Sequence, residues 1–153
     1  RRGPTWLTPH AAEFQRLFPE LAELPPHQAA SQAAQQSQCW VLRKGARTLI
    51  ASPDGTVRQL LQSDARAARA GLGDVLSGYA AGLGAMGLAS GLLKTDDRFD
   101  GLLALAALAH ATAGIRQSQA GEGAASPLAI AQRLQNAKNA DICEQAENNL
   151  MHN

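Results

Sequence analysis

A run of small residues leads into an apolar segment at Ala70–Gly78, and this run is well suited to bind an anion. The first backbone N–H groups of a helix have no partner within the helix and lie at the positive end of its dipole. Glycine lets a phosphate approach such a main chain closely. The candidate residues for a main-chain anion hole are Ala70, Gly71, Leu72 and Gly73.

Asp74 follows this run and falls in the first turn of the predicted helix. A carboxylate beside a transferring phosphoryl group can accept the proton of an attacking hydroxyl. We therefore take Asp74 as the candidate catalytic base. An ordinary acidic first turn, which stabilises the helix dipole after a flexible loop, is the alternative interpretation.

A basic connection between two predicted strands is the second candidate. Arg43, Lys44 and Arg47 place three cations there, and cations hold nucleotide phosphates well. The candidate nucleotide-binding residues are Lys44, Gly45, Ala46, Arg47 and Thr48, together with Gly73. An ordinary basic hairpin turn with a glycine fits this stretch as well.

A histidine lies just beyond the first predicted strand. His10 follows Thr8-Pro9, at the strand end where open α/β sheets bind their ligands, so it is a candidate substrate-binding residue. The alternative is a helix-capping segment with Glu13 in its acidic first turn.

The other histidines and cysteines favour structural roles. His110 lies in an apolar helical segment, which is typical of a hydrogen-bonded core histidine. Cys39 lies in a strand-like apolar run and is predicted to be a buried, unreactive thiol. No group of His, Cys, Asp and Glu in the sequence has zinc-ligand spacing, so no metal ligands are assigned. Two widely separated cysteines favour a reducing, cytoplasmic compartment.

The elements that must position these residues alternate between strand and helix at first and are mostly helical later, which predicts part of an α/β sandwich. The predicted strands are 6–8, 39–42, 48–51 and 57–61. The predicted helices are 11–17, 27–37, 74–86, 102–117 and 127–134. The predicted loops are 62–69, 94–100 and 121–125. We expect residues 1–135 to form one domain and residues 136–153 to form a polar C-terminal tail.

Composition limits the classes of partner. The 153 residues carry a net charge of +1, which gives no electrostatic signature of nucleic-acid or anionic-membrane binding. No apolar run is long enough for a membrane span, so neither nucleic acid nor membrane is expected as a partner. Aromatic residues make up only 4%, so the core must be built mainly from Ala, Leu, Val and Ile.

Taken in order, three segments resemble the ADP-dependent NAD(P)H-hydrate dehydratases of the ribokinase-like superfamily. The segments are Leu7-Thr8-Pro9-His10 with Glu13-Phe14, Val41-Leu42 with Lys44-Gly45-Ala46-Arg47-Thr48, and Gly71 with Gly73-Asp74-Val75-Leu76-Ser77-Gly78. The resemblance runs from about Thr5 to Leu134. It implies the C-terminal part of a ribokinase-like αβα sandwich, with three or more strands followed by helices.

The resemblance implies repair of damaged nicotinamide cofactors. Family members use ADP, or in some cases ATP, with Mg²⁺ to phosphorylate the hydroxyl of (6S)-NAD(P)H hydrate, and phosphate is then eliminated to restore NAD(P)H. It implies that Asp74 is the base, that residues 70–73 stabilise the phosphoryl group, that residues 44–48 line the nucleotide site and that His10 and Asp74 contact the hydrate. It also implies an upstream NAD(P)H-hydrate epimerase domain or subunit, and a homo-oligomer.

The chain departs from the family pattern at several places. Ala11-Ala12 replace Pro-Gly, Gln62-Ser63-Asp64 replace Thr-Gly-Asn, and Leu72 replaces Ser. Leu72 is compatible with an anion hole because the donor is the backbone N–H. The resemblance implies further central strands in the family domain that complete the substrate site. We therefore expect the C-terminal part of a longer protein, a split subunit or a truncated gene product, and we expect the isolated chain to be inactive. Another ribokinase-like small-molecule kinase, or an inactive fragment acting as a binding or structural module, is the alternative.

Overall fold

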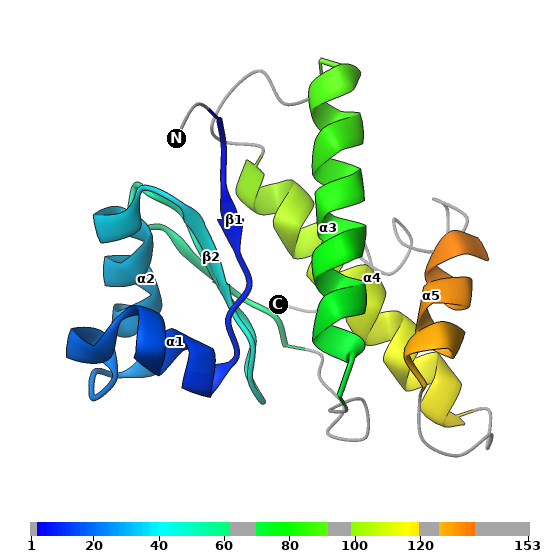
Figure 1. The fold of residues 1–153 in the computed structure, drawn as a ribbon, viewed down its shortest axis with the longest axis horizontal. Coiled ribbons are helices and arrows are strands. Elements are labelled where there is room, and N and C mark those ends of the chain that lie inside the picture. The colour runs from blue at the N-terminus through cyan, green and yellow to red at the C-terminus, as the bar shows by residue number, and fades with distance from the viewer. Residues whose placement is uncertain (1–2, 62–69, 92–98, 120–125, 137–153) are drawn as a thin grey trace.

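The computed structural model describes residues 3–61, 70–91, 99–119 and 126–136 (Figure 1). Its strands are β1 (Trp6–Leu7), β2 (Trp40–Arg43), β3 (Leu49–Ala51) and β4 (Val57–Gln59). Its α-helices are α1 (Ala11–Leu17), α2 (Pro26–Ser37), α3 (Leu72–Ala89), α4 (Phe99–Gln119) and α5 (Pro127–Asn136), with a 3-10 turn η1 at Pro19–Leu21.

The four strands form one mixed sheet in the order β1-β2-β3-β4. β1 runs parallel to β2, with Trp6 opposite Trp40, whereas the β2–β3 and β3–β4 pairs are antiparallel. The β3–β4 hairpin turns at Asp54-Gly55, where Gly55 has a φ of 93° and the Asp54 carboxylate accepts the Thr56 N–H at 2.8 Å. The predicted strand-turn-strand unit is thereby confirmed.

Helices cover both faces of the sheet, and the alternation of side chains along β2 shows why. Val41 faces the core formed with α1 and α2, whereas Trp40 and Leu42 face the core formed with α3 and α4 (Figure 1). Four fully buried alanines let α2 approach the sheet closely: Ala29, Ala30, Ala33 and Ala34. The result is a three-layer αβα arrangement, with α5 packed on α3 and α4.

Several predicted boundaries were wrong. α3 begins at Leu72 rather than residue 74 and continues to Ala89. α4 begins at Phe99, inside the loop predicted for residues 94–100. Phe99 packs on Trp40 with ring centroids 4.8 Å apart, and Asp100 pairs with Arg58, so two tertiary contacts support the extra turn.

The β2 prediction began one residue early, and Thr48, Leu60 and Leu61 lie outside the strands. α5 extends to Asn136, the residue at which the polar tail was predicted to begin. The predicted loops at 62–69 and 121–125, and the tail from residue 137, lie outside the described residues. Among the described helices, none has both the length and the apolar character needed to cross a membrane.

Candidate active site

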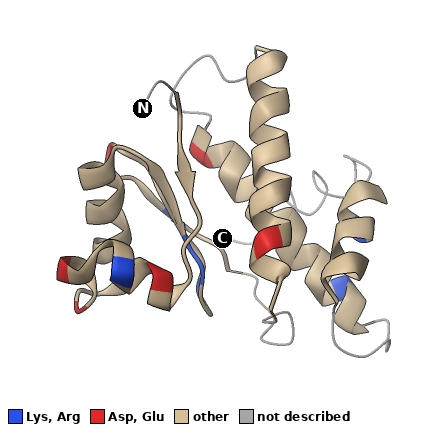
Figure 2. Ribbon diagram, in the orientation of Figure 1, with Lys and Arg blue, Asp and Glu red and all other residues tan. Residues whose placement is uncertain are grey.

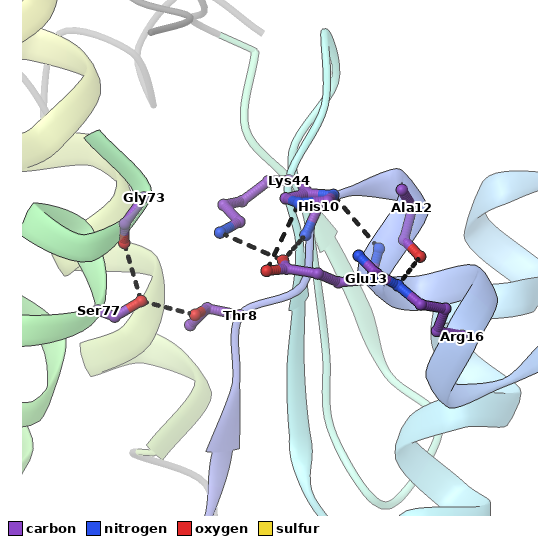
Figure 3. Close-up of polar contacts among 8 residues, drawn as sticks. All are labelled: Thr8, His10, Ala12, Glu13, Arg16, Lys44, Gly73 and Ser77. Carbon is purple, nitrogen blue, oxygen red and sulfur yellow. Dashed lines mark hydrogen bonds and ion pairs between the residues drawn. The ribbon is translucent and has the colours of Figure 1, made fainter. Parts of the chain in front are cut away.

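The carboxyl ends of β1 and β2 bring two of the predicted segments together. The two strands are parallel, so the segments that follow them leave the sheet at the same edge. The Lys44 N–H donates to the Pro9 carbonyl at 2.8 Å, which fixes the segment after β2 against the segment after β1. His10 and Lys44 therefore lie side by side (Figure 3).

His10 is the N-cap residue of α1, so the capping alternative is confirmed with the histidine itself as the cap. Its Nδ1 accepts the Glu13 N–H at 3.3 Å, and its own N–H donates to Glu13 Oε2 at 2.8 Å. Because Nδ1 is an acceptor here, the neutral ring carries its proton on Nε2, which lies 3.5 Å from Glu13 Oε1. The imidazole is half-exposed and faces solvent.

Glu13 links this cap to Lys44. Its Oε2 lies 3.8 Å from Lys44 Nζ. The hydrogen bond from the His10 main chain, with the Lys44 charge as a smaller contribution, holds the pKa of Glu13 below its ordinary 4.5. No role in the site was predicted for Glu13 from the sequence. Its position three residues after the candidate His10 was the signal that could have revealed that role.

The ammonium of Lys44 reaches the first turn of α3. A Cβ built on Gly73 would lie 2.8 Å from Lys44 Nζ, so a side chain at position 73 would displace the ammonium. The structure thus brings the basic segment to the predicted anion hole through one lysine. Arg43 takes no part, because its guanidinium stacks over the Phe14 ring at 4.7 Å.

The start of α3 has the form of an anion site. Gly71 is its N-cap with a φ of 84°, and no side chain caps the helix. The Val75 N–H donates to the Gly71 carbonyl at 3.2 Å. The N–H groups of residues 72–74 precede this bond, so by helix geometry they have no acceptor within the helix. Gly71 also packs against Pro127 of α5, which a Cβ at position 71 would approach to 3.0 Å. Ala70 lies in the turn just before this cap.

Asp74 is the only charged residue of α3 and lies in its exposed first turn (Figure 2). The alternative interpretation, an ordinary acidic first turn exposed to solvent, is consistent with this position of Asp74. The added observation is the Lys44 ammonium beside the adjacent Gly73. Asp74 thus lies at the helix end, next in sequence to the glycine that the Lys44 ammonium approaches, whereas the carboxylate near Lys44 Nζ is that of Glu13.

Two hydroxyl groups join β1 to α3. Thr8 Oγ1 lies 2.8 Å from Ser77 Oγ, and Ser77 Oγ donates to the Gly73 carbonyl at 2.8 Å (Figure 3). From the sequence, Thr8 and Ser77 were recognised only as members of the segments that resemble the family, with no role of their own. The spacing of four between Gly73 and Ser77 was the available signal, since it places the serine one turn above the glycine carbonyl.

His110 of α4 lies beneath the start of α3. Burial lowers the pKa of His110 below its ordinary 6.5. A hydrogen bond with the Leu72 main chain raises the pKa in part, and the charge of Lys44 lowers it further. Its Nε2 is buried with no hydrogen-bond partner in the part of the chain that the structure describes. The prediction that His110 lies in the core is confirmed. The prediction that its ring is fully hydrogen-bonded is not, because Nε2 has no partner among the described residues. Cys39 is fully buried, as expected.

Other candidates remain apart from this centre. Gly45, Ala46 and Arg47 are exposed in the β2–β3 turn, and the Thr48 hydroxyl donates to the Gly45 carbonyl at 3.4 Å. Within the ranges that the structure describes, no three His, Cys, Asp or Glu side chains are grouped closely enough to hold a metal. Asp64, which stands in place of the family's Asn, lies outside the described residues.

Comparison with known proteins places this geometry in a family. The family model described as NAD(P)H-hydrate dehydratase matches residues 1–136. The chain belongs to the NAD(P)H-hydrate dehydratase family. The resemblance inferred from the three segments is therefore confirmed, and the match covers every candidate residue.

Curated and solved members of the family agree with this assignment. The bifunctional NAD(P)H-hydrate repair enzyme of Synechocystis is 43% identical over 121 residues, which are 78% of this chain and 21% of that enzyme. The corresponding enzyme of Gloeobacter violaceus is 49% identical over 78 residues, 51% of this chain and 15% of that enzyme.

A crystal structure of an ADP/ATP-dependent NAD(P)H-hydrate dehydratase from Bacillus subtilis, co-crystallized with ATP/Mg²⁺, superposes with a TM-score of 0.67 at 26% identity. The match covers 89% of this chain and 47% of that one. The predicted α/β class and ribokinase-like sandwich are confirmed by this likeness. The chain spans about half of the solved enzyme and about a fifth of the Synechocystis one.

Proposed function

We propose that this chain supplies the nucleotide-binding and proton-accepting part of an enzyme that returns (6S)-NAD(P)H hydrate to NAD(P)H at the expense of ADP or ATP. The observation that supports the proposal best is the Lys44 ammonium against Gly73, next to the exposed Asp74. Because the solved relative is about twice as long, residues outside this chain would complete the substrate site.

The start of α3 fits a nucleotide's terminal phosphate. The uncapped amides and the Lys44 ammonium both favour negative charge, and the missing Cβ of Gly73 leaves the main chain open. Residues 70–73 would hold the transferring phosphoryl group, and residues 44–48 would line the rest of the nucleotide. A bound nucleotide would supply the phosphoryl group, together with the Mg²⁺ that its own phosphates would hold, and no residue of this chain is assigned as a metal ligand.

Asp74 would take the proton of the substrate hydroxyl while that oxygen bonds to the nucleotide's terminal phosphorus, and the bond from this phosphorus to its bridging oxygen would break, so that AMP leaves from ADP or ADP leaves from ATP. The amides at the start of α3 would stabilise the charge that develops on the phosphoryl oxygens. Loss of phosphate would then break the carbon–oxygen bond while the neighbouring ring carbon gives up a proton, and the carbon–carbon double bond of the dihydronicotinamide would be restored. Because its Nδ1 accepts a hydrogen bond from Glu13, His10 would contact the hydrate through Nε2.

We place the finer assignments in the same proposal. Residues 1–135 are the C-terminal portion of the dehydratase domain, and residues 136–153 are a polar C-terminal tail. An NAD(P)H-hydrate epimerase domain or subunit provides the S epimer, and the enzyme is a cytoplasmic homo-oligomer. The bifunctional naming of the Synechocystis and Gloeobacter enzymes supports a second activity beside this one. The open edge of β1 is where we expect the remaining part of the dehydratase domain to add.

The test is the ADP-dependent return of (6S)-NADH hydrate to NADH, followed at the dihydronicotinamide absorbance band. The chain is assayed alone and after co-expression with the remaining half of the Synechocystis dehydratase domain. Asp74→Asn should abolish turnover but retain ADP binding by calorimetry. Asp54→Asn is the matched control, because Asn still accepts the turn hydrogen bond. An unchanged rate in Asp74→Asn contradicts the role of Asp74, and absence of ADP binding contradicts the proposal.

A further inference from the structure

The two hydroxyls between β1 and α3 form a directed chain of hydrogen bonds. A serine hydroxyl carries one proton, and Ser77 Oγ donates it to the Gly73 carbonyl at 2.8 Å. The 2.8 Å contact between Thr8 Oγ1 and Ser77 Oγ must then be donated by Thr8. The order is Thr8 to Ser77 to the carbonyl of Gly73. Successive bonds of this kind polarise and strengthen one another.

This chain of bonds ends on the peptide group that carries the anion site. The carbonyl of Gly73 and the N–H of Asp74 belong to one peptide unit. Hydrogen bonds to that carbonyl therefore make the Asp74 N–H a better donor, and this amide lies in the uncapped first turn of α3.

At its other end the chain of bonds begins beside Lys44 and His10. Thr8 is followed by Pro9, whose carbonyl accepts the Lys44 N–H at 2.8 Å, and then by His10. The segment after β1 is thus bonded to the segment after β2 and, through Thr8, to the start of α3. All three parts of the proposed site meet in this one segment (Figure 3).

Packing does not fill all of the space along β1 and α3. A groove of about 360 Å³ lies along them, lined among others by Trp6, Thr8, Ser77 and Ala85. Trp6 reaches across it to the helix near Gly84. The Thr8–Ser77 hydrogen bond lies at the end of this groove nearest the site. There it can fix the distance between β1 and α3, which packing along the groove does not set.

We propose that Thr8 and Ser77 are positioning residues, which set the first turn of α3 against Lys44 and His10 and so prepare the phosphate site. The proposal rests on the proposed function for its ligand, but the spacing itself can be measured without any ligand. It differs from ordinary packing because it depends on the hydroxyl of residue 8 and not on the volume of that side chain.

The first measurement is the distance between spin labels at Gln15→Cys in α1 and Gly82→Cys in α3, read by pulsed electron resonance. Both positions are exposed, and a Cβ at Gly82 meets nothing within 4 Å. Cys143→Ser removes the second cysteine, and Cys39 is fully buried. Thr8→Val and Ser77→Ala should broaden or shift the distance distribution. Thr8→Ser, which keeps the hydroxyl, should leave it unchanged.

Ser118→Ala is the matched control, because Ser118 donates to the Gly114 carbonyl at 3.1 Å in the same helical geometry within α4. The second measurement is ADP affinity by calorimetry. We expect about five- to tenfold weaker binding in Thr8→Val and Ser77→Ala, which is about the loss of one hydrogen bond. The double variant should lose little more than either single variant, because both break one chain of bonds.

Two outcomes of the distance measurement would overturn the inference: label distances that are the same in Ser77→Ala as in Ser118→Ala, or equal changes in Thr8→Val and Thr8→Ser. If the unaltered chain does not bind ADP, the proposed function fails, and the label distances still decide whether the hydroxyls set the spacing. Altered distances with unaltered ADP affinity would also contradict the positioning role.

Discussion

Lys44 and Gly73 lie 29 positions apart in the sequence, yet a single methyl group at Gly73 would touch the lysine ammonium, at 2.8 Å from Nζ. An ammonium beside a helix N-terminus faces the positive end of the helix dipole, which is unfavourable without a neighbouring anion. Glu13 supplies one carboxylate at 3.8 Å from Nζ. A nucleotide phosphate would supply a second anion closer to the ammonium. This electrostatic arrangement motivates the predictions below.

Gly73→Ala should weaken ADP binding without weakening the fold. The new methyl group displaces Lys44, and loss of one charge-assisted hydrogen bond costs about 1.5–3 kcal/mol, or at least tenfold in affinity. Alanine is also the better helix former by as much as about 1 kcal/mol, so the melting temperature should not fall. Calorimetry with ADP and thermal unfolding would measure both effects.

Gly82→Ala is the matched control for that substitution. Gly82 lies in the same helix, and a Cβ there meets nothing within 4 Å. We expect a small rise in stability and an unchanged Kd for ADP. Equal affinities in Gly73→Ala and Gly82→Ala would show that Lys44 does not need the space above Gly73.

Glu13→Gln should change how stability depends on pH. The pKa of Glu13 is lowered in the folded chain, so its carboxylate contributes stability that is fully present above its ordinary 4.5 and is lost as pH falls through the lower folded value. Glutamine has no such titration but can still serve the capping box of α1. The difference in unfolding free energy between the two proteins should therefore shrink in acid, as measured by denaturant titration.

Glu20→Gln provides the control, because Glu20 is also exposed and lies outside the cap. Its effect on unfolding free energy should show much less dependence on pH. A constant difference between the unaltered chain and Glu13→Gln across the acid range would contradict the proposed carboxylate cap.

His110 should make the fold sensitive to mild acid. Burial lowers the pKa of His110, so the unfolded chain takes up a proton at higher pH than the folded chain does. The stability that the neutral ring contributes is fully present above about pH 6.5 and is lost as pH falls through the folded pKa. His110→Leu should flatten the decline in melting temperature below pH 7, whereas the exposed His27→Leu should not.

The sequence was sufficient to predict the elements and the three segments of the site, because each depends on local pattern. Apolar runs, Pro25-Pro26 and the Asp54-Gly55 turn signal their structures within a few residues. The parallel β1–β2 pair was not predicted, and it is this pair that brings His10 beside Lys44.

The contacts between segments could not be predicted in the same way. The Thr8–Ser77 bond and the approach of Lys44 to Gly73 depend on how α3 crosses the sheet, and that crossing depends on packing among distant residues. The early start of α4 has the same origin. Residues 99 and 100 have no strong helical pattern of their own, but Phe99 stacks on Trp40 and Asp100 reaches Arg58.

Arg58→Met should destabilise the fold by about 1–3 kcal/mol through the partner that it leaves behind. The Arg58 Nε donates to Asp100 Oδ2 at 2.5 Å, and the Asp100 side chain is only 6% exposed. Without the guanidinium, the buried carboxylate at the start of α4 keeps, among the described residues, the hydrogen bond from the Gly101 N–H at 2.7 Å. Arg47→Met, at an exposed turn position, should cost less than about 0.5 kcal/mol. Denaturant unfolding measures both, and equal values would show that the Arg58–Asp100 pair does not hold α4 to the sheet.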